Sequence, residues 1–517
     1  MHCSLPAFIF NSLIRFIRHL GLILFALNLS PFAMYAQKKY SPTIEICDCR
    51  FKMDSSYAAI APASIKSNLS LPINIDSSFQ TQCGYLIVPE NRKNSKSKMI
   101  KLPFIVLKSK NPKKKKDPVL FTSGGPGNSS LGWINGMQKS LVIGDRDCIA
   151  FEQRGTRYAI PYLRLFEIDS AMKEAYRKNL SKDSMWLEAV KRYKKRLLQK
   201  GIDLDGYNSD ETVSDITDLL SVLKIDSVNL FGGSYSGGLM MAVLQKNPNK
   251  VRSLVLDSPL PMFVPIDEDE PVNFHEGLHV LFEHVEKDSA DKGKYADLMQ
   301  RFYNYFTSIR NTVFSLPYYD STEGKTLNIQ YTKNELLDIV VSDMLNYTAL
   351  KDLPFKITEL LRGNHAPYLK PRIDRILNGY PAPDGMRMSV YCADQAAFHN
   401  QERVKQIYKL YPYMEGYHIN DVWQEVCDCW NVQPIKEKTK QPFYSPVPAL
   451  IGDGEMDPAC RPLYMRLIRH YMPNAQTFLF INRSHGVGGK DFFSMTQQFL
   501  DNPYKKIKPP SETVVPY

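Results

Sequence analysis

Short apolar runs that end in polar or glycine-rich turns recur along much of the chain. Four segments contain apolar runs with the length and composition of a buried strand. They are PVLFTSGGPG (118–127), CIAFEQRG (148–155), DSVNLF (226–231) and VRSLVLDSP (251–259). Before the third of these, SDETVSDITDLLSVLK (209–224) has a capping serine and apolar residues at helical spacing, which predicts an amphipathic helix. Strands that alternate with helices in this way indicate a parallel α/β sheet.

The alternation stops near Pro261 and returns with the strand-like runs in SPVPALIGDGEMDP (445–458) and QTFLFI (476–481). The residues between them have a mainly helical pattern rich in Tyr, Phe and Leu. The sequence therefore predicts an α/β domain with a mainly helical cap inserted before its last strands. The expected boundaries are 37–261 and 441–503 for the α/β core, 262–440 for the cap, and 504–517 for a loose C-terminal tail.

The first 36 residues differ from the rest of the chain. Arg15 and Arg18 precede the apolar run LGLILFALNLSPFAMYA, which ends in small residues. This is the layout of a secretory signal peptide, with cleavage expected after Ala36. A retained membrane anchor is the alternative, although the run is short for a membrane span and is broken by Pro31. We expect a secreted or periplasmic protein with no stable membrane association after cleavage.

Charge adds little to this picture. The formal net charge is +11, and the most obvious basic cluster is NPKKKKDP at 111–118, between two strand-like runs. A nucleic-acid-binding surface would need basic and aromatic residues spaced along one face. We interpret the cluster as a solvated hairpin tip and expect no nucleic-acid partner.

The chain has nine cysteines, of which Cys3 lies in the expected signal segment. Export to an oxidising compartment would allow the other cysteines to form disulfides. No further ligands stand at the spacing of a zinc site, so we expect disulfides and no metal. Sequence alone does not fix connectivity. The candidate pairings are Cys47 or Cys49 with Cys83, and Cys392 with Cys427 or Cys429.

The segment NLFGGSYSGG contains two serines, and each of them matches half of the nucleophile pattern G-x-S-x-G. A nucleophile on a sharp strand-to-helix turn should stand about two residues beyond the strand. That position is Ser234, whereas Ser236 should already lie in the first turn of the following helix. We therefore predict Ser234 as the nucleophile.

A serine nucleophile needs a base, and the base needs a carboxylate to hold its tautomer. In hydrolases with this kind of turn, the acid and then the histidine follow later strands. Asp453, Glu455 and Asp457 come after the run VPALIG, and His485 comes after the last predicted strand. The histidine is therefore expected to be His485, and the acid one of these three.

The negative oxygen that forms when a serine attacks a carbonyl needs fixed N–H donors. We expect one donor from the backbone of Tyr235, the residue after the nucleophile. The other should come from the SGGPG turn, and Gly125 is the expected donor because glycine lets the backbone approach a substrate closely.

Several motifs together resemble one family. They are GGPG (124–127), QRG (153–155), GGSY (232–235), GDGEMDP (452–458) and SHG (484–486), joined by CGYLIVPEN, YCAD and the long segment before the nucleophile. Over most of residues 80–500 the chain is similar to the proline iminopeptidase and tripeptidyl aminopeptidase family of α/β-hydrolases. The resemblance implies the α/β-hydrolase fold with a cap that closes over the active site, and it implies that Asp457 orients the histidine.

The same resemblance implies a serine exopeptidase without a cofactor, which releases proline or a di- or tripeptide from the amino terminus of a peptide. Three positions depart from the family pattern: Glu152 replaces an aspartate, Ser236 a glycine, and Ser123 the histidine common in iminopeptidases. The preferred substrate length therefore stays open. A cap carboxylate should bind the free amine of the substrate, and the candidates are Glu268, Glu270 and Asp394.

A competing motif is HEGLH at 275–279, which matches the zinc-protease pattern H-E-x-x-H. The extended form of that pattern has glycine and histidine where this chain has Phe282 and Val285. We interpret the match as chance on a cap helix. The alternative functions are an esterase-type serine hydrolase, a zinc peptidase that uses HEGLH, and an inactive secreted binding protein; the oligomeric state is open.

Overall fold

The computed structural model describes residues 40–51, 79–134, 144–287, 293–378 and 385–517, together with residues 73, 75 and 136. The expected signal segment, 1–36, lies outside the described residues. All elements named below belong to the compact unit Pro42–Tyr517.

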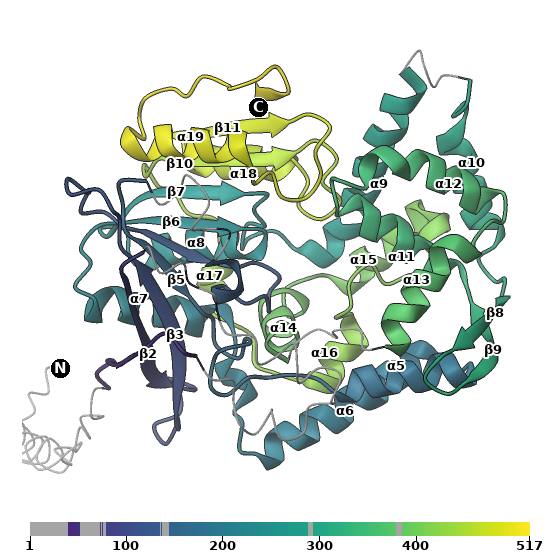
Figure 1. Ribbon diagram of the computed structural model, residues 1–517, viewed down its shortest axis with the longest axis horizontal. Helices are drawn as coiled ribbons and strands as arrows, with labels where there is room; N and C mark the ends of the chain where they lie inside the picture. Colours follow the sequence, from purple (N-terminus) through teal and green to yellow (C-terminus); the bar gives the residue numbers. More distant parts are fainter. Residues whose placement is uncertain are drawn as a thin grey trace, which may run out of the picture. The chain divides into compact units, whose positions relative to one another are not determined.

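One ten-stranded sheet runs through this unit in the order β1-β2-β3-β5-β4-β6-β7-β10-β11-β12 (Figure 1). The strands from β5 to β11 in this order are parallel, while β1, β2 and β3 are antiparallel and β12 closes the far edge antiparallel. The parallel sheet predicted from the sequence is confirmed. The bounds are β1 (Thr43–Cys47), β2 (Thr81–Pro89), β3 (Met99–Leu107), β4 (Val119–Thr122), β5 (Cys148–Phe151), β6 (Val228–Gly233), β7 (Val251–Asp257), β10 (Ala449–Gly454), β11 (Ala475–Phe480) and β12 (Val514–Pro516).

The central strands are mainly apolar because helices cover both faces of the parallel sheet. Every residue of β5 and of β10 is buried, as expected for strands with no solvent face. Parallel strands bring their carboxyl ends to one edge, where the chain continues into the loops that bear polar residues. The loops after β6, β7, β10 and β11 therefore lie next to one another.

Four helices follow core strands: α7 (Ser209–Val222), α8 (Tyr235–Lys246), α18 (Leu463–Tyr471) and α19 (Lys490–Asp501). The predicted serine cap of α7 is wrong. The N-cap is Asn208, whose side chain accepts the backbone N–H of Glu211. Ser209 is the first helical residue, and its hydroxyl instead donates to Asp394.

The insertion between β7 and β10 is mainly helical, as predicted, and in Figure 1 the parallel strands point toward its helices. It also contains a hairpin, β8 (Phe314–Asp320) and β9 (Lys325–Tyr331), which the sequence analysis did not predict. The available signal in the sequence was the placement of Phe314, Leu316 and Tyr318 at alternate positions. Its helices are α9 (Ile266–Lys287), α10 (Leu298–Ser308), α11 (Lys333–Met344), α12 (Leu353–Leu361), α13 (Ala366–Leu377), α14 (Gly385–Tyr391), α15 (Gln401–Leu410), α16 (Gln424–Trp430) and α17 (Glu437–Lys440).

Two helices that precede β6 in the chain pack against this insertion. They are α5 (Glu167–Lys178) and α6 (Lys182–Gln199). The ring of Tyr193 stacks on Trp430 with 5.6 Å between centroids, inside one shared hydrophobic cluster. The helical layer beside the sheet edge is therefore built from two separate stretches of the chain (Figure 1).

Two smaller expectations are wrong. The basic segment 111–118 is not a hairpin tip, because β5 lies between β3 and β4 in the sheet. Its Lys114 pairs with Asp147 at 2.9 Å. The C-terminal tail is not loose, because β12 pairs with Phe478–Phe480 of β11, and valines suit such an edge position.

Two disulfides join cysteines that are distant in sequence. They are Cys49–Cys83 and Cys392–Cys427, which is one of the two expected alternatives in each case. Disulfides are typical of proteins from oxidising compartments. Within the part of the chain that the structure describes, no helix combines the length and apolarity needed to cross a bilayer.

Candidate active site

Ser234 forms the sharp turn between β6 and α8, with φ 54° and ψ −130°. A positive φ is strained for a residue with a side chain, and such strain is typical of the nucleophile turn in hydrolases. The turn is tight enough that a Cβ on Gly232 would lie 2.4 Å from the carbonyl oxygen of Ser236. Glycine is therefore required two residues before Ser234.

The second serine faces a different direction. Ser236 is fully buried in the first turn of α8, and its hydroxyl lies 2.5 Å from that of Thr122 on β4. This contact accounts for the serine at position 236. Ser234, in contrast, lines the large pocket at the carboxyl edge of the sheet.

His485 lines the same pocket and is held by Asp457. The distance between His485 Nδ1 and Asp457 Oδ2 is 2.7 Å, and the other oxygen of Asp457 accepts the backbone N–H groups of Ala459 and Cys460 at 2.8 Å each. A proton on Nδ1 leaves Nε2 as an acceptor, which is the tautomer that a general base needs.

The other two acids of this loop have different partners. Burial and the neighbouring Asp457 raise the pKa of Asp453 well above its usual value. Glu455 accepts the backbone N–H of Asn482 at 3.1 Å and lies 3.3 Å from His284. Among the three candidate acids, Asp457 is the one that contacts His485.

A second carboxylate lies near the histidine, and sequence analysis missed it. Asp257, the last residue of β7, accepts the backbone N–H groups of Val487 and Gly488 at 2.7 and 3.1 Å. Burial alone would lower the pKa of His485, but Asp457 and Asp257 raise it above its usual value. The available signal was the position of Asp257 at the end of a predicted parallel strand.

The two predicted N–H donors flank Ser234, the predicted nucleophile. Tyr235 is the first residue of α8, so its N–H has no partner within the helix. Gly125 has φ +115°, and the turn packs so closely on the nucleophile that a Cβ on Gly124 would lie 3.1 Å from Ser234 Cβ. Both donor residues line the pocket.

The QRG motif supports this turn from behind. The side-chain amide of Gln153 donates to the carbonyl of Ser123 at 2.6 Å. Glu152 is fully buried and accepts the N–H of Leu131 and the hydroxyl of Ser129 at 2.9 and 3.1 Å. The residues on both sides of GGPG are therefore anchored to the loop after β5.

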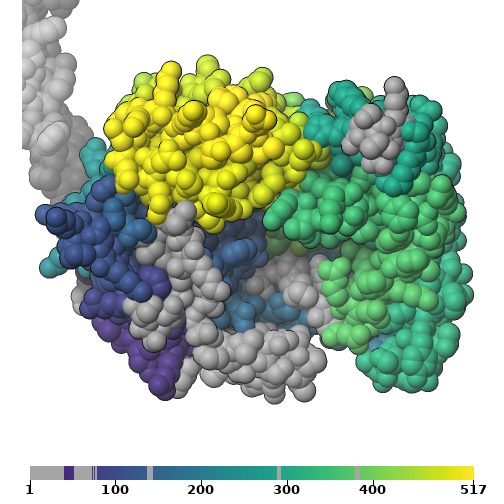
Figure 2. Space-filling view, turned by 45° about the horizontal axis from the view of Figure 1, so that its top comes forward, coloured from purple at the N-terminus to yellow at the C-terminus, as the bar shows by residue number. Residues whose placement is uncertain are grey.

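The pocket has a volume of about 1520 Å³, more than the 300–1,000 Å³ usual for small ligands. Residues of the core loops and of the insertion line it together. In Figure 2 the surface is hollowed between the C-terminal part of the chain and the inserted segment. The space suits an extended substrate that reaches from Ser234 into the cap.

The three cap acids differ in their surroundings. Glu268 points away from the pocket lining, since its oxygens contact the N–H of Asn400 at 2.9 Å and Arg403 at 3.0 Å. Asp394 lines the pocket, but both of its oxygens accept hydrogen bonds from Ser209. Burial raises the pKa of Asp394 to about 7.

Glu270 lines the pocket and keeps one oxygen open. Its Oε1 lies 3.1 Å from the Tyr391 hydroxyl oxygen and accepts the Asn420 amide at 2.8 Å, while no donor among the described residues contacts Oε2. Burial and the charge of Asp267 raise the pKa of Glu270 to about 8. A cation that entered the pocket would therefore find a carboxyl group ready to ionise.

The HEGLH histidines occupy other environments. The ring of His275 lies among tyrosines, 4.5 Å from Tyr411 between centroids, and His279 pairs with Glu283 at 3.0 Å. Glu276 pairs with Arg461 at 3.0 Å. The described ranges contain no group of three or more His, Cys, Asp or Glu side chains placed to hold a metal ion.

Sequence analysis also missed three pocket residues that lie in the insertion or beside the acid. Arg387 and Asn420 carried no motif, and their role depends on contacts across the pocket. Cys460 follows Asp457 by three residues, and its buried thiol lies within hydrogen-bonding reach of the Ser234 hydroxyl. Burial and the carboxylates of Asp457 and Asp453 raise the pKa of this thiol well above its usual value.

Comparison with known proteins agrees with the fold. Residues 117–315 match a family model described as alpha/beta hydrolase fold. The sheet order and the turn at Ser234 are those of this fold, and the chain has the α/β-hydrolase fold that the sequence predicted. No curated protein matches the chain.

Solved structures similar to the chain are distant. A serine hydrolase from the polyaromatic-hydrocarbon-degrading bacterium Cycloclasticus zankles shares 13% sequence identity with this chain. The match covers 82% of this chain and 100% of the hydrolase chain, with a TM-score of 0.35. An esterase from Exiguobacterium antarcticum shares 12% identity, covering 80% of this chain and 97% of its own, with a TM-score of 0.32.

The Asp457–His485 contact predicts a large effect of Asp457→Asn. An asparagine can present an N–H to Nδ1 and favour the wrong tautomer, so we expect kcat to fall by about 10⁴-fold. Glu455→Gln is the matched control, because Glu455 contacts Asn482 and His284 instead. Steady-state kinetics on a chromogenic ester measure both variants, and a larger loss in Glu455→Gln would contradict the assignment of the acid.

The position of Asp257 predicts a shift in pH dependence. His485 acts as a base only when neutral, so kcat/KM should rise with pH through the pKa of His485. Asp257 raises that pKa, and Asp257→Asn should therefore move the acidic limb to lower pH. Asp453→Asn is the control, because the carboxylates that raise the pKa of His485 are those of Asp457 and Asp257. If the acidic limb of kcat/KM lay at the same pH in Asp257→Asn and in the unmodified protein, Asp257 would carry no charge.

Proposed function

We propose that this α/β-hydrolase-fold protein is a serine exopeptidase that releases short amino-terminal units from peptides. Ser234 would act as nucleophile, His485 as base and Asp457 as the acid that orients the base. The observation that carries the peptidase assignment is Glu270, a pocket carboxyl with an open oxygen and a pKa of about 8. A carboxyl placed in this way fits the ammonium group at the start of a peptide.

The proposed chemistry uses the groups that line the pocket. The Ser234 hydroxyl loses its proton to His485 Nε2 as its oxygen forms a bond to the scissile carbonyl carbon. The N–H groups of Gly125 and Tyr235 would stabilise the negative carbonyl oxygen. The C–N bond then breaks, and His485 returns the proton to the leaving amine. Water attacks the acyl-enzyme with the same base, which frees the amino-terminal unit and restores Ser234.

Recognition of the amine would fix the length of the released unit. Glu270 stands on the cap helix α9, and Ser234 stands on the core turn, so the substrate must span the distance between them. When the substrate's ammonium group binds, Glu270 would change from a neutral carboxyl to a carboxylate by releasing one proton, because ion pairing favours the charged pair. Asp394 is the second candidate among the cap acids, and its bonds to Ser209 leave it less available.

The remaining expectations belong to the same proposal. The substrate is a peptide, the reaction needs no cofactor, and no nucleic acid takes part. The two disulfides support a site of action in an oxidising compartment. We infer that the protein is secreted or periplasmic, that cleavage follows Ala36, and that the mature chain has no stable membrane association.

The experiment compares free and N-acetylated peptide p-nitroanilides that carry proline, a dipeptide or a tripeptide. We expect Glu270→Gln to raise KM for the free-amine substrates by about 10- to 100-fold, the value of one charge-assisted hydrogen bond. Acetylated substrates should be poor for the unmodified protein and unaffected by the change. Glu268→Gln is the matched control, because Glu268 contacts Asn400 and Arg403 outside the pocket.

The same assay separates the alternatives. Equal turnover of free and acetylated substrates would indicate an esterase or an endopeptidase and would contradict the proposal. A chelator should leave activity intact, whereas a zinc peptidase built on HEGLH would lose it with the metal-activated water. Loss of activity on chelation, together with an inactive His275→Ala, would transfer the chemistry from Ser234 to the cap helix α9.

A further inference from the structure

A side chain of the insertion reaches the turn beside the nucleophile. Arg387, on α14, donates from Nη1 to the backbone carbonyl of Gly125 at 2.9 Å. The Cβ of Arg387 also lies 3.3 Å from the position that a Cβ on Gly127 would take. The turn expected to supply an N–H to the negative oxygen is therefore held from the cap side.

The guanidinium of Arg387 is fixed by two further partners on the same cap loop. Its Nε donates to Asp421 at 2.7 Å, and its Nη2 donates to the side-chain carbonyl of Asn420 at 2.9 Å. A planar guanidinium with three separate acceptors has a single orientation. Any displacement of Asn420 is therefore transmitted to the group that holds Gly125.

Asn420 completes the connection to the pocket carboxyl. Its amide nitrogen donates to Glu270 Oε1 at 2.8 Å, while its oxygen accepts from Arg387. The four groups form a continuous line of hydrogen bonds from Glu270 through Asn420 and Arg387 to the carbonyl of Gly125. This relay joins the expected amine site to the expected oxyanion turn.

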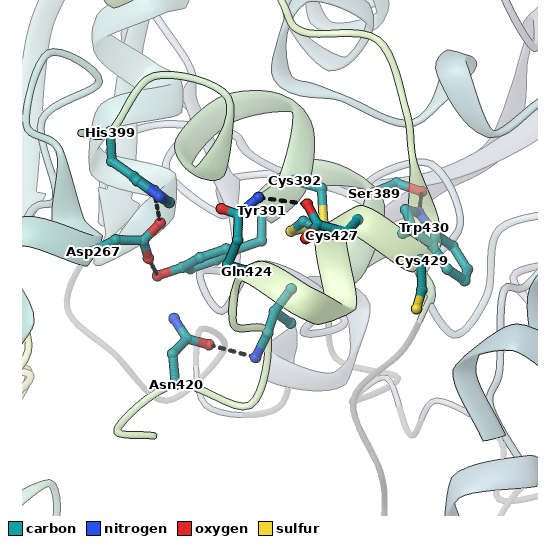
Figure 3. Close-up of a disulfide and its surroundings, with 12 residues drawn as sticks. Asp267, Ser389, Tyr391, Cys392, His399, Asn420, Gln424, Cys427, Cys429 and Trp430 are labelled. Carbon is teal, nitrogen blue, oxygen red and sulfur yellow. Dashed lines mark hydrogen bonds and ion pairs between the residues drawn. A yellow bond between two sulfur atoms is a disulfide. The ribbon is translucent and has the colours of Figure 1, made fainter. Parts of the chain in front are cut away.

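The cap end of the relay is itself anchored. The Tyr391 hydroxyl, which also contacts Glu270, donates to Asp267, and Asp267 pairs with His399 (Figure 3). The next residue, Cys392, is tied to Cys427 by a disulfide. Glu270 therefore has a fixed frame on the cap side, against which a change at its open oxygen can act.

A parallel contact reaches the other expected donor. The phenol of Tyr235 lies 2.8 Å from the hydroxyl of Ser209, and Ser209 donates to Asp394 of the insertion. Gly125 is thus held by a cap residue directly, and the side chain of Tyr235 is linked to the cap through Ser209. The arrangement makes the position of the cap a condition for the geometry of the core turn.

We propose that Asn420 and Arg387 are positioning residues that couple binding of the substrate's free amine at Glu270 to the oxyanion turn at Gly125. This inference rests on the proposed function. An ammonium at Oε2 favours the ionised form of Glu270, which releases its proton to water, and the resulting charge strengthens the hydrogen bond from Asn420 and orders the relay. Binding energy from a remote part of the substrate is then used to orient the reacting centre, so it appears in kcat as well as in KM.

The test measures kcat and KM separately for alanyl-alanyl-prolyl p-nitroanilide and its N-acetyl form. The variants are Asn420→Ala, which interrupts the relay, and Arg387→Lys, which keeps the charge beside Asp421 but loses the guanidinium fork. Asn364→Ala is the matched control, because Asn364 makes the same kind of amide-to-carboxylate bond, at 2.7 Å to Glu359, outside the pocket lining. Thermal unfolding of each variant checks its fold. If Asn420→Ala is unstable, the kinetics of Arg387→Lys decide the test.

The expected result is a fall of about tenfold in the ratio of kcat for the free substrate to kcat for the acetylated one, which is within the usual range of coupling between two sites. The control should keep the ratio of the unmodified protein. An unchanged ratio with equal losses on both substrates would overturn the coupling and leave the exopeptidase function standing. A ratio near one in the unmodified protein would overturn the proposed function and the coupling with it.

Discussion

The strained turn at Ser234 is the constraint on which the rest of the site depends. A φ of 54° for serine costs about 1–3 kcal/mol, and the surrounding backbone holds it. The backbone N–H of Ser234 donates to the backbone carbonyl of Asp257, and the backbone carbonyl of Ser234 accepts the N–H groups of Gly237 and Leu260, at 2.9 to 3.0 Å. With its backbone bonded on both sides, the residue has one orientation. Its hydroxyl is then presented to the pocket, and the loops after the neighbouring strands must match it.

Those neighbouring loops carry several acids close together, and their surroundings differ. Asp457 is surrounded by three donors, one of which is His485, whereas burial and the neighbouring Asp457 raise the pKa of Asp453 well above its usual value. A charged pair at both positions would repel. The raised pKa of Asp453 reduces this repulsion, so Asp457 can hold the histidine, and Asp257 on the adjacent strand helps to raise the pKa of His485.

Much of the core was predictable because its signals are local. Buried strands followed by polar turns are visible in sequence, and the order of Ser234, Asp457 and His485 along the chain follows from the order of the strands. The choice between Ser234 and Ser236 needed only the strand register, and the structure places Ser234 in the pocket and Ser236 against Thr122. The candidate disulfides were narrowed to two alternatives each by spacing alone.

The parts that sequence did not predict depend on long-range contacts. Arg387 meets Gly125 across 262 positions of the chain, and no pattern in either segment announces that contact. The hairpin of β8 and β9 lies within a largely helical stretch, and its apolar residues alternate over only a few positions. The tail forms β12 by pairing with the edge strand β11, and this edge exists only once the sheet has assembled. Glu270 could be named as a candidate, but its open oxygen is visible only in three dimensions.

The most direct test of the account is the site at which a fluorophosphonate reacts with the protein. Peptide mass spectrometry after labelling should place a single adduct on Ser234, with loss of hydrolysis in proportion to labelling. The adduct should disappear in Ser234→Ala and persist in Ser236→Ala. An adduct on Ser236, or full hydrolysis by a protein that carries an adduct on Ser234, would contradict the assignment of the nucleophile.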